Sequence, residues 1–201
     1  MKKEMREKVK ALKRQMILEE AGKYFEEEGF ESLTMQTLAK RCGVSVGALY
    51  KLFDSKEELF YAYVVGEYER VFEEIVRANA AQSDPYEKLL TMVRLIFTHY
   101  STKPKVILDP IAGDPLFFTK INLQYQHPAQ ILYNYGAELL EEYTKSKDLP
   151  LTDPLEAIYL FSGLMLGRME HWLKFGGDLI SQSQPTLEFF LNGLHAPLAP
   201  A

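Results

Sequence analysis

The sequence predicts an all-α protein: an N-terminal three-helix domain that contains a helix-turn-helix, then a C-terminal helical bundle, with about nine helices in all. Two observations predict this fold. Apolar residues recur at helical intervals along most of the chain, and Asp-Pro pairs mark helix starts in its second part. Signals for β-strands are almost absent. The chain has 201 residues, 47% of them hydrophobic, so it can bury a proper core in one or two small domains.

The first three helices are expected at residues 8–28, 35–42 and 46–52. The second and third each have one inward apolar stripe, made of Met35, Leu38, Ala39 and Cys42, then of Val46, Leu49 and Phe53. Gly43 stands where the second helix ends, because glycine takes a positive φ without a Cβ clash. Ser45 can then cap the third helix. Two short helices around a tight turn are the layout of a DNA-reading motif.

The outer face of helix 46–52 does not suit a protein core. It carries the small residues Ser45, Gly47 and Ala48, which permit close approach of the backbone to a ligand. Tyr50 and Lys51 on the same face can reach phosphates.

A fourth helix, expected at residues 56–80, begins with a capping box formed by Ser55 and Glu58. Its N-terminal end carries a positive partial charge. Because Lys56 stands at that end, we expect a phosphate site there.

The run GVSVGALYKLFDSKEELF, with the preceding helix and the GFESLT turn, closely resembles the DNA-binding segment of the tetracycline-repressor (TetR) family of bacterial transcription regulators. The match covers about residues 10–62 and is specific, because its motif residues stand in one order without gaps. The resemblance implies a DNA-binding domain at residues 1–54 and a ligand-binding and dimerisation domain at residues 55–201. The implied DNA contacts are Thr34, Thr37, Ser45, Val46, Gly47, Ala48, Tyr50, Lys51 and Lys56.

Two departures from the family pattern bear on which bases are read. The family often has lysine or proline at the position of Val46, and threonine or serine at that of Ala48. Base contacts here therefore lean on apolar contact, for example with a thymine methyl. Lys51 and Leu52 replace a more usual aromatic or histidine pair, which leaves the operator sequence open.

Charge is divided unevenly along the chain, whose net charge is −5. Residues 1–56 hold 12 Lys and Arg against 9 Asp and Glu, whereas residues 57–201 hold 11 against 19. The first fourteen residues carry Lys2, Lys3, Arg6, Lys8, Lys10, Lys13 and Arg14. A basic arm ahead of the helix-turn-helix suits DNA phosphates. The alternative is a solvated, frayed helix start.

The single cysteine, Cys42, excludes an intramolecular disulfide and a multi-cysteine zinc site. It lies on the inward stripe, so we expect a small core residue. The N-terminus is charged, so no signal peptide is expected. The longest apolar stretch, at residues 157–167, is far shorter than the roughly 20 residues that a membrane span needs. We expect a soluble cytoplasmic protein without a membrane segment, cofactor or metal.

Asp-Pro pairs punctuate the second part of the chain at residues 84–85, 109–110, 114–115 and 153–154. Asp is a favoured N-cap, and Pro suits the first helical position. The helices expected after residue 80 span residues 85–102, 104–111, 115–147, 154–175 and 185–194. Pro128 should kink or split the helix at 115–147.

Helix 154–175 is apolar nearly all round, so it must be covered on both sides. Gly163 and Gly167 add a small-residue stripe that lets another backbone approach. With the apolar helix 185–194, it favours a symmetric dimer built as a four-helix bundle. The alternative is a monomer whose core absorbs both helices. The candidate interface residues are Gly163, Leu166, Gly167, Leu187, Phe190, Leu191 and Leu194.

The middle helices mix amphipathic aromatic residues with scattered polar ones, a composition that suits a small-molecule cavity. The candidate ligand contacts are Tyr100, Phe118, Asn122, Tyr125, Tyr133, Tyr159, Arg168 and Trp172. For each of them the alternative is a plain core or surface role. Arg168 has two interpretations: contact with the anionic end of a ligand, or an ion pair with an acidic residue such as Glu170 of the partner subunit.

These features favour a ligand-responsive DNA-binding regulator, a repressor that binds a palindromic operator as a homodimer. A small apolar or amphipathic effector would release it by preferring one spacing of the two DNA-reading heads. An enzyme is not expected, because the four histidines show no paired spacing and the sequence contains no nucleophile motif or phosphate-binding glycine loop. The remaining alternative is an effectorless DNA-binding or architectural dimer.

Overall fold

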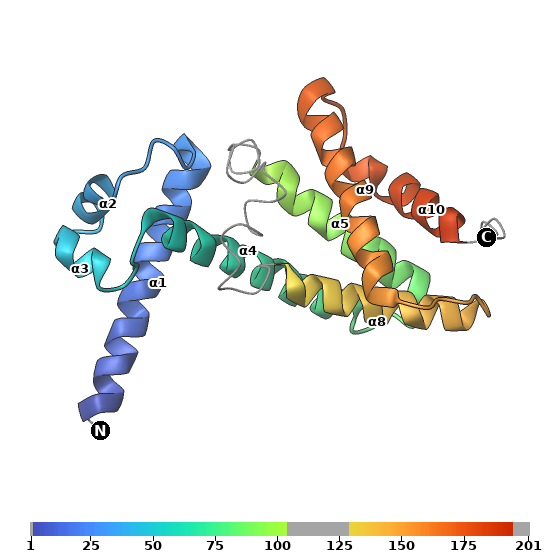
Figure 1. Ribbon diagram of the computed structural model, residues 1–201, viewed down its shortest axis with the longest axis horizontal. Helices are drawn as coiled ribbons and strands as arrows, with labels where there is room; N and C mark the ends of the chain where they lie inside the picture. The colour runs from blue at the N-terminus through green and yellow to red at the C-terminus, as the bar shows by residue number, and fades with distance from the viewer. Residues whose placement is uncertain (1, 104–128, 195–201) are drawn as a thin grey trace. The chain divides into compact units, whose positions relative to one another are not determined.

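The computed structural model describes residues 2–103 and 129–194, and every regular element in these two stretches is helical (Figure 1). The elements are α1 Lys2–Glu28, α2 Met35–Arg41, α3 Val46–Tyr50, α4 Lys56–Asn79, α5 Pro85–Thr102, α8 Gln130–Ser146, α9 Pro154–Phe175, the 3-10 turn η1 Ile180–Gln182 and α10 Ser183–Leu194. The prediction of an all-α fold is confirmed.

The described residues form two compact units. Unit 1 comprises residues 2–67 with Lys103, and unit 2 comprises residues 68–102 and 129–194. Helix α4 runs through the division without a break, so its first half belongs to unit 1 and its second half to unit 2. The functional division expected after residue 54 stays a prediction.

Unit 1 is held together where α1 packs against α4. Phe25 of α1 meets the Phe60 ring edge-on, with centroids 5.1 Å apart, and Phe30 reaches the same ring at 4.9 Å. Tyr63 completes the cluster, 5.4 Å from Phe25. The two backbones approach closely because Gly22 has no side chain: a Cβ there would lie 2.8 Å from Tyr63 Cε2.

A charge cluster lies beside these rings in unit 1. Lys103 Nζ lies 2.6 Å from Glu26 Oε1 and also contacts the Glu67 carboxylate. The hydroxyl of Tyr63 donates to the same Glu26 oxygen at 3.0 Å. Glu67 is only 7% exposed, so pairing with a cation is what makes its burial tolerable.

Contacts between near neighbours in the sequence set the start of α2 and the turn into α3. The turn has the residues that the sequence predicts for it. Thr34 and Thr37 form a capping box at the start of α2. Gly43 follows α2 with a φ of +64°, a conformation that costs glycine little. Ser45 Oγ then accepts a hydrogen bond from Ala48 N–H at 3.2 Å and caps α3.

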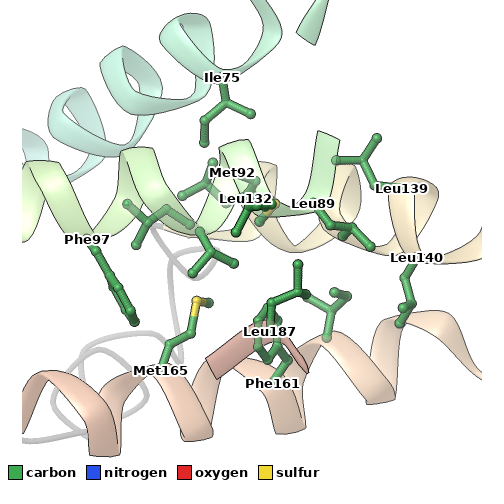
Figure 2. Packing of buried hydrophobic residues seen from close by; sticks show 14 of the residues in the cluster. Ile75, Leu89, Met92, Phe97, Leu132, Leu139, Leu140, Phe161, Met165 and Leu187 are labelled. Carbon is green, nitrogen blue, oxygen red and sulfur yellow. The ribbon is translucent and has the colours of Figure 1, made fainter. Parts of the chain in front are cut away.

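Unit 2 packs α5, α8, α9 and α10 around one core, to which the end of α4 adds Ile75 (Figure 2). Helices α8 and α10 both lie against α5, and α9 lies against α8. The side chains in this core that are almost wholly buried include Ile75, Leu89, Val93, Phe97, Leu139, Leu140, Ile158, Phe161 and Leu187. Burying a side chain of this size stabilises the fold by about 1.5–3 kcal/mol.

Two of the Asp-Pro pairs start helices as predicted. Asp153 Oδ1 accepts hydrogen bonds from the N–H groups of Leu155 and Glu156, each at 3.0 Å, at the start of α9. Asp84 Oδ1 accepts from Tyr86 N–H at 2.9 Å at the start of α5. The pairs at residues 109–110 and 114–115 lie outside the described residues.

The remaining helix bounds differ from expectation by more than one residue in three places. Helix α1 begins at Lys2 instead of about residue 8, because no glycine or proline interrupts its first five turns. Helix α3 ends at Tyr50, two residues early. Helix α10 begins at Ser183, after a 3-10 turn that Asp178 caps. The expected helix at 104–111 and the start of that at 115–147, with Pro128, lie outside the described residues.

We expect Gly22→Ala to lower the free energy of unfolding by roughly 1–3 kcal/mol, because the added methyl must displace the buried ring of Tyr63. The matched control is Gly66→Ala in α4, where a Cβ meets no described atom within 4 Å. That variant should gain roughly 0.5–1 kcal/mol from helix propensity. Urea unfolding followed by circular dichroism measures both. Equal stabilisation of the two variants would contradict the close contact between α1 and α4.

Candidate functional site

The outward face of α3 is open, and its inward face is sealed. Leu49 is fully buried, whereas Gly47, Ala48 and Lys51 are exposed and Tyr50 is 45% exposed. No described atom lies within 4 Å of the position that a Gly47 Cβ would take. Nothing in unit 1 therefore obstructs this face, and a helix of this kind can lie in the major groove of DNA with its small residues toward the base edges.

Three candidate DNA contacts with hydroxyl side chains, Thr34, Thr37 and Ser45, also stabilise the starts of α2 and α3. Thr34 Oγ1 accepts from Thr37 N–H at 3.1 Å, and Thr34 N–H donates to Thr37 Oγ1 at the same distance. Ser45 caps α3, and Val46, the first residue of that helix, is half-buried. Thr34, Thr37 and Ser45 are all exposed, so they remain accessible to a phosphate while they fix the two helix starts.

Lys56, at the start of α4, is held in place by unit 1. Its Nζ donates to the backbone oxygen of Glu31 at 3.2 Å and lies 4.0 Å from the centre of the Phe30 ring. An ammonium has three donors, and one hydrogen bond leaves two of them for a phosphate. The structure thus fixes the position of Lys56, and its phosphate contact stays a prediction.

The loop between α3 and α4 is fastened to α1. Arg14 of α1 stacks over the Phe53 ring at 4.3 Å and lies 3.6 Å from Glu58 Oε1. Ser55 Oγ accepts from Glu58 N–H at 3.1 Å, so the predicted cap is present. The Glu58 carboxylate accepts from Asp54 N–H at 2.5 Å, one residue earlier than in a standard capping box.

Cys42, next to this motif, is half-buried instead of a full core residue. Burial raises the pKa of its thiol, so the side chain stays protonated at neutral pH and is a poor nucleophile. Within residues 2–103 and 129–194, no group of three or more His, Cys, Asp or Glu is placed to hold a metal ion. No helix in these stretches is both long and apolar enough to cross a membrane.

In unit 2, tyrosines from four helices lie close together beside the apolar core. The hydroxyls of Tyr68 on α4 and Tyr100 on α5 are 2.8 Å apart. The rings of Tyr133 on α8 and Tyr159 on α9 have centroids 4.4 Å apart, and Tyr159 donates to Gln130 at 3.1 Å. The structure therefore brings together three of the candidate ligand contacts, Tyr100, Tyr133 and Tyr159. Tyr68 belongs with them, but its sequence position gave no signal beyond helical spacing.

Burial controls the ionisation of these phenols. It raises the pKa of Tyr100 and that of Tyr133 each to about 12, against the opposing hydrogen bonds from Tyr68 and Ser162. Burial also raises the pKa of Tyr68 well above its ordinary value. The phenols stay neutral at physiological pH, so they offer a ligand hydrogen-bond donors and acceptors within an otherwise apolar surrounding.

Arg168 and Trp172 of α9 make other contacts. Arg168 Nε donates to Thr186 Oγ1 at 3.3 Å, and Trp172 Nε1 donates to the backbone oxygen of Gly177 at 3.1 Å, just after α9 ends. Glu170 pairs with a lysine of its own helix. Both interpretations of Arg168 therefore stay predictions. The remaining candidate ligand contacts, Phe118, Asn122 and Tyr125, lie outside the described residues.

Helix α9 has apolar residues on both faces, as the sequence predicts. Phe161 and Met165 are buried in unit 2, whereas Gly163, Leu166 and Gly167 are exposed. A Cβ at either glycine would meet no described atom within 4 Å. Three other apolar residues of this region are also strongly exposed: Leu160, Phe175 and Phe189.

Helix α10 turns two of its predicted interface residues, Leu187 and Leu191, inward, which corrects the expectation for these two, whereas Phe190 and Leu194 stay predictions. Leu187 and Leu191 lie in the core of unit 2, at 0% and 3% exposure. Phe190 stacks on Phe161 with centroids 4.4 Å apart, and Leu194 is half-buried. The physical reason is that the apolar face of this amphipathic helix already covers the core, and the same face cannot also lie on the surface.

Comparison with known proteins shows that the N-terminal part of the chain is similar to bacterial transcription regulators. Residues 17–63 match the family described as "Bacterial regulatory proteins, tetR family". The uncharacterized HTH-type transcriptional regulator YuxN of Bacillus subtilis is 34% identical over 84 residues, which cover 40% of this chain and 29% of that protein. The HTH-type transcriptional repressor KstR of Mycolicibacterium smegmatis is 35% identical over 81 residues, 40% of each chain. The chain thus matches less than half the length of these curated relatives.

Solved structures share the fold over most of the chain. The fatty acid degradation regulator FadR of Bacillus halodurans superposes with a TM-score of 0.72 at 21% identity, covering 89% of this chain and 94% of that one. FadR of Bacillus subtilis in complex with stearoyl-CoA gives 0.72 at 19%, covering 89% and 98%. FadR of Thermus thermophilus in complex with lauroyl-CoA gives 0.69 at 21%, covering 94% and 98%. Because the sequence identities are this low, these similarities show a common fold and nothing more.

An alkaline titration should test the tyrosine cluster. The folded-state pKa of Tyr100 and Tyr133 is raised, so their neutral forms contribute stability that is fully present below pH about 10 and lost as pH rises toward about 12. We expect Tyr133→Phe to reduce this loss, measured as the free energy of urea unfolding at several pH values. The control Tyr50→Phe removes an exposed phenol and should change nothing. Equal effects of the two variants would contradict burial of the Tyr133 hydroxyl.

Proposed function

We propose that the chain, whose residues 17–63 match the tetR family of bacterial regulatory proteins, is a DNA-binding transcription regulator that responds to a small molecule. In the finer form of the proposal, it is a repressor that binds a palindromic operator as a homodimer. An apolar or amphipathic effector bound to unit 2 releases it. Such an effector acts only by binding more tightly to one arrangement of the two DNA-reading heads than to the other.

The single observation that carries the DNA-binding proposal is the two-sided character of α3. Its Leu49 side is fully buried, and its opposite side presents Gly47, Ala48 and Tyr50 with nothing described in front of Gly47. A helix of five residues contacts few bases, so one head discriminates poorly among sites. Two heads on half-sites about one helical turn apart, roughly 34–36 Å or somewhat more, supply the missing specificity.

The exposed side of α9 supports the homodimer. Leu160 and Leu166 are 69% and 48% exposed, and the two glycines at 163 and 167 leave room for a second helix to approach. On α10, Phe189 is 71% exposed. Apolar side chains of this size grouped on adjacent helices favour burial against a second copy of the same surface.

A fatty acyl-CoA is the effector class to test first. The FadR proteins of Bacillus subtilis and Thermus thermophilus, which share the fold, were solved with stearoyl-CoA and lauroyl-CoA. An acyl chain suits an apolar bundle, its thioester oxygen can accept from a neutral phenol such as Tyr133, and its phosphates suit a cation such as Arg168. An effectorless DNA-binding dimer is the alternative.

Gly47→Leu is expected to reduce specific binding to the level of non-specific DNA, a loss on the order of 10³-fold or more. The new side chain stands on the open face of α3 and holds that helix away from the groove floor. Fluorescence anisotropy with duplexes from the DNA flanking the protein's own gene measures the loss. The melting temperature is the control for folding and should stay within a few degrees, because nothing in unit 1 occupies that space. Unchanged affinity would show that this face does not enter the groove.

Lauroyl-CoA or stearoyl-CoA should raise the melting temperature and release the operator duplex. A ligand at 100 times its Kd stabilises the state that it binds by about 2.7 kcal/mol. The measurement is thermal shift together with anisotropy on the labelled duplex. Coenzyme A without an acyl chain is the matched control ligand, and it should do neither. If both acyl-CoA ligands bind and leave DNA affinity unchanged, the effector class is wrong.

Arg168→Leu separates the two interpretations of that residue. If Arg168 meets the anionic end of the effector, the variant still binds DNA but needs more acyl-CoA for release. If it pairs with Glu170 of the partner subunit instead, the variant loses its dimer in sedimentation experiments. Lys174→Leu is the control, because it removes a cation of α9 whose partner is Glu170 of its own helix.

A further inference from the structure

A groove in unit 1 lies between the first half of α1 and the α3 motif, and the proposed function assigns it no role. Its volume is about 440 Å³. Three cations of α1, Arg6, Lys10 and Lys13, line it together with Lys51, the residue that follows α3. Apolar side chains, among them Ile17 of α1, complete the lining. We refer to this feature as the arm groove.

Among the residues that the structure describes, the cations of the arm groove have no acidic partner. No Asp or Glu lines it, and within the described stretches none of the four cations forms an ion pair. Neighbouring arginines behave differently: Arg14 lies 3.6 Å from Glu58, and Arg41 lies 2.8 Å from Glu20. Unit 1 therefore pairs these two arginines with carboxylates, whereas the four cations that line the groove have no such pair among the described residues. Four like charges around one concavity attract a polyanion.

The spacing of the cations along α1 fits a line of phosphates. Arg6, Lys10 and Lys13 are four and three residues apart, so they share one face of the helix. From first to last they span about 10 Å along the helix axis. That length equals the axial rise of about three phosphates of one DNA strand.

The arm itself gains little from unit 1. Residues 3–13 of α1 are all exposed, and this part of the helix runs on past α3 (Figure 1). An isolated helix this short is marginal in water. A partner that accepts its basic face would give this segment its fixed place.

We propose that the arm groove binds the phosphodiester backbone of the duplex that α3 reads. This inference rests on the proposed DNA-binding function and deepens it, because it assigns a second contact outside the major groove. Ala48 and Lys51 both line the groove and belong to the outward face of the α3 motif, so a strand in the groove lies next to the bases that α3 faces. A free polyphosphate has the same chemistry, but it would compete with the DNA at Lys51 instead of extending its binding site.

The experiment compares two variants that lose the same charge. Lys10→Gln/Lys13→Gln removes two cations of the arm groove. Lys8→Gln/Lys147→Gln is the matched control, because Lys8 points about 200° away from Lys10 around α1 and Lys147 follows α8 in unit 2. Lysine and glutamine have similar helix propensities, so both variants should fold alike. The operator affinity of each is measured by anisotropy at several salt concentrations.

The groove variant should lower the slope of log affinity against log salt by about 1.8 for each bound protomer, and at physiological salt its affinity should fall on the order of 30-fold per protomer. The control variant should match the wild type. If the two variants have equal slopes, the arm groove does not bind DNA, although the DNA-binding function stands. If the wild-type protein binds no duplex, the proposed function itself fails.

A separate arm tests the free ligand. Tripolyphosphate alone, without DNA, is added to the wild type and to Lys10→Gln/Lys13→Gln in a thermal-shift measurement. Stabilisation of the wild type only, combined with equal salt slopes of the two variants on DNA, would overturn the proposal in favour of a small polyanion.

Discussion

The close packing of α1 on α4 is the constraint on which the rest of unit 1 depends. Helix α3 has only five residues and would not be stable alone, so its orientation is set by the residues that pack around it. Those surroundings are fixed by Phe25 and Phe60, which meet edge-on because Gly22 lets the two helices touch. Arg14, over the ring of Phe53, ties the end of the α3 motif to the same scaffold. The orientation of the proposed DNA-binding face thus depends on this aromatic contact.

Charged side chains in unit 1 fall into two groups, those in ion pairs between helices and those without such pairs. Carboxylates are used where they hold helices together: Glu58 near Arg14, Glu20 near Arg41, and the Glu26 and Glu67 pair on Lys103. The four cations of the arm groove have no such partner in the described part of the chain. A protein with a net charge of −5 can therefore present a positive surface to DNA, because affinity depends on the local field at the phosphates and not on the total charge.

In the proposed function, the helices of unit 2 must form a core and also offer polar groups to a ligand. Phe161 and Leu187 fill the centre of the bundle (Figure 2). The hydroxyls of Tyr68 and Tyr100 lie 2.8 Å apart and hydrogen-bond to each other, which offsets the cost of removing them from solvent. Neutral phenols beside an apolar core suit an amphipathic molecule, and α9, with apolar residues on both faces, joins this region to the proposed dimer surface.

The sequence by itself determined the features that depend on near neighbours. Gly43, Ser45 and Asp153 end or begin helices through contacts within four residues, so their roles could be predicted, as could the outward face of α3 and the all-round apolar character of α9. Only the tertiary structure decided which apolar face turns inward. Leu187 and Leu191 went to the core, although periodicity alone served a core and an interface equally well. The pairing of Tyr68 with Tyr100 and the meeting of Lys10 with Lys51 were likewise beyond the sequence, because residues more than thirty positions apart are brought together by helix packing, which no local pattern records.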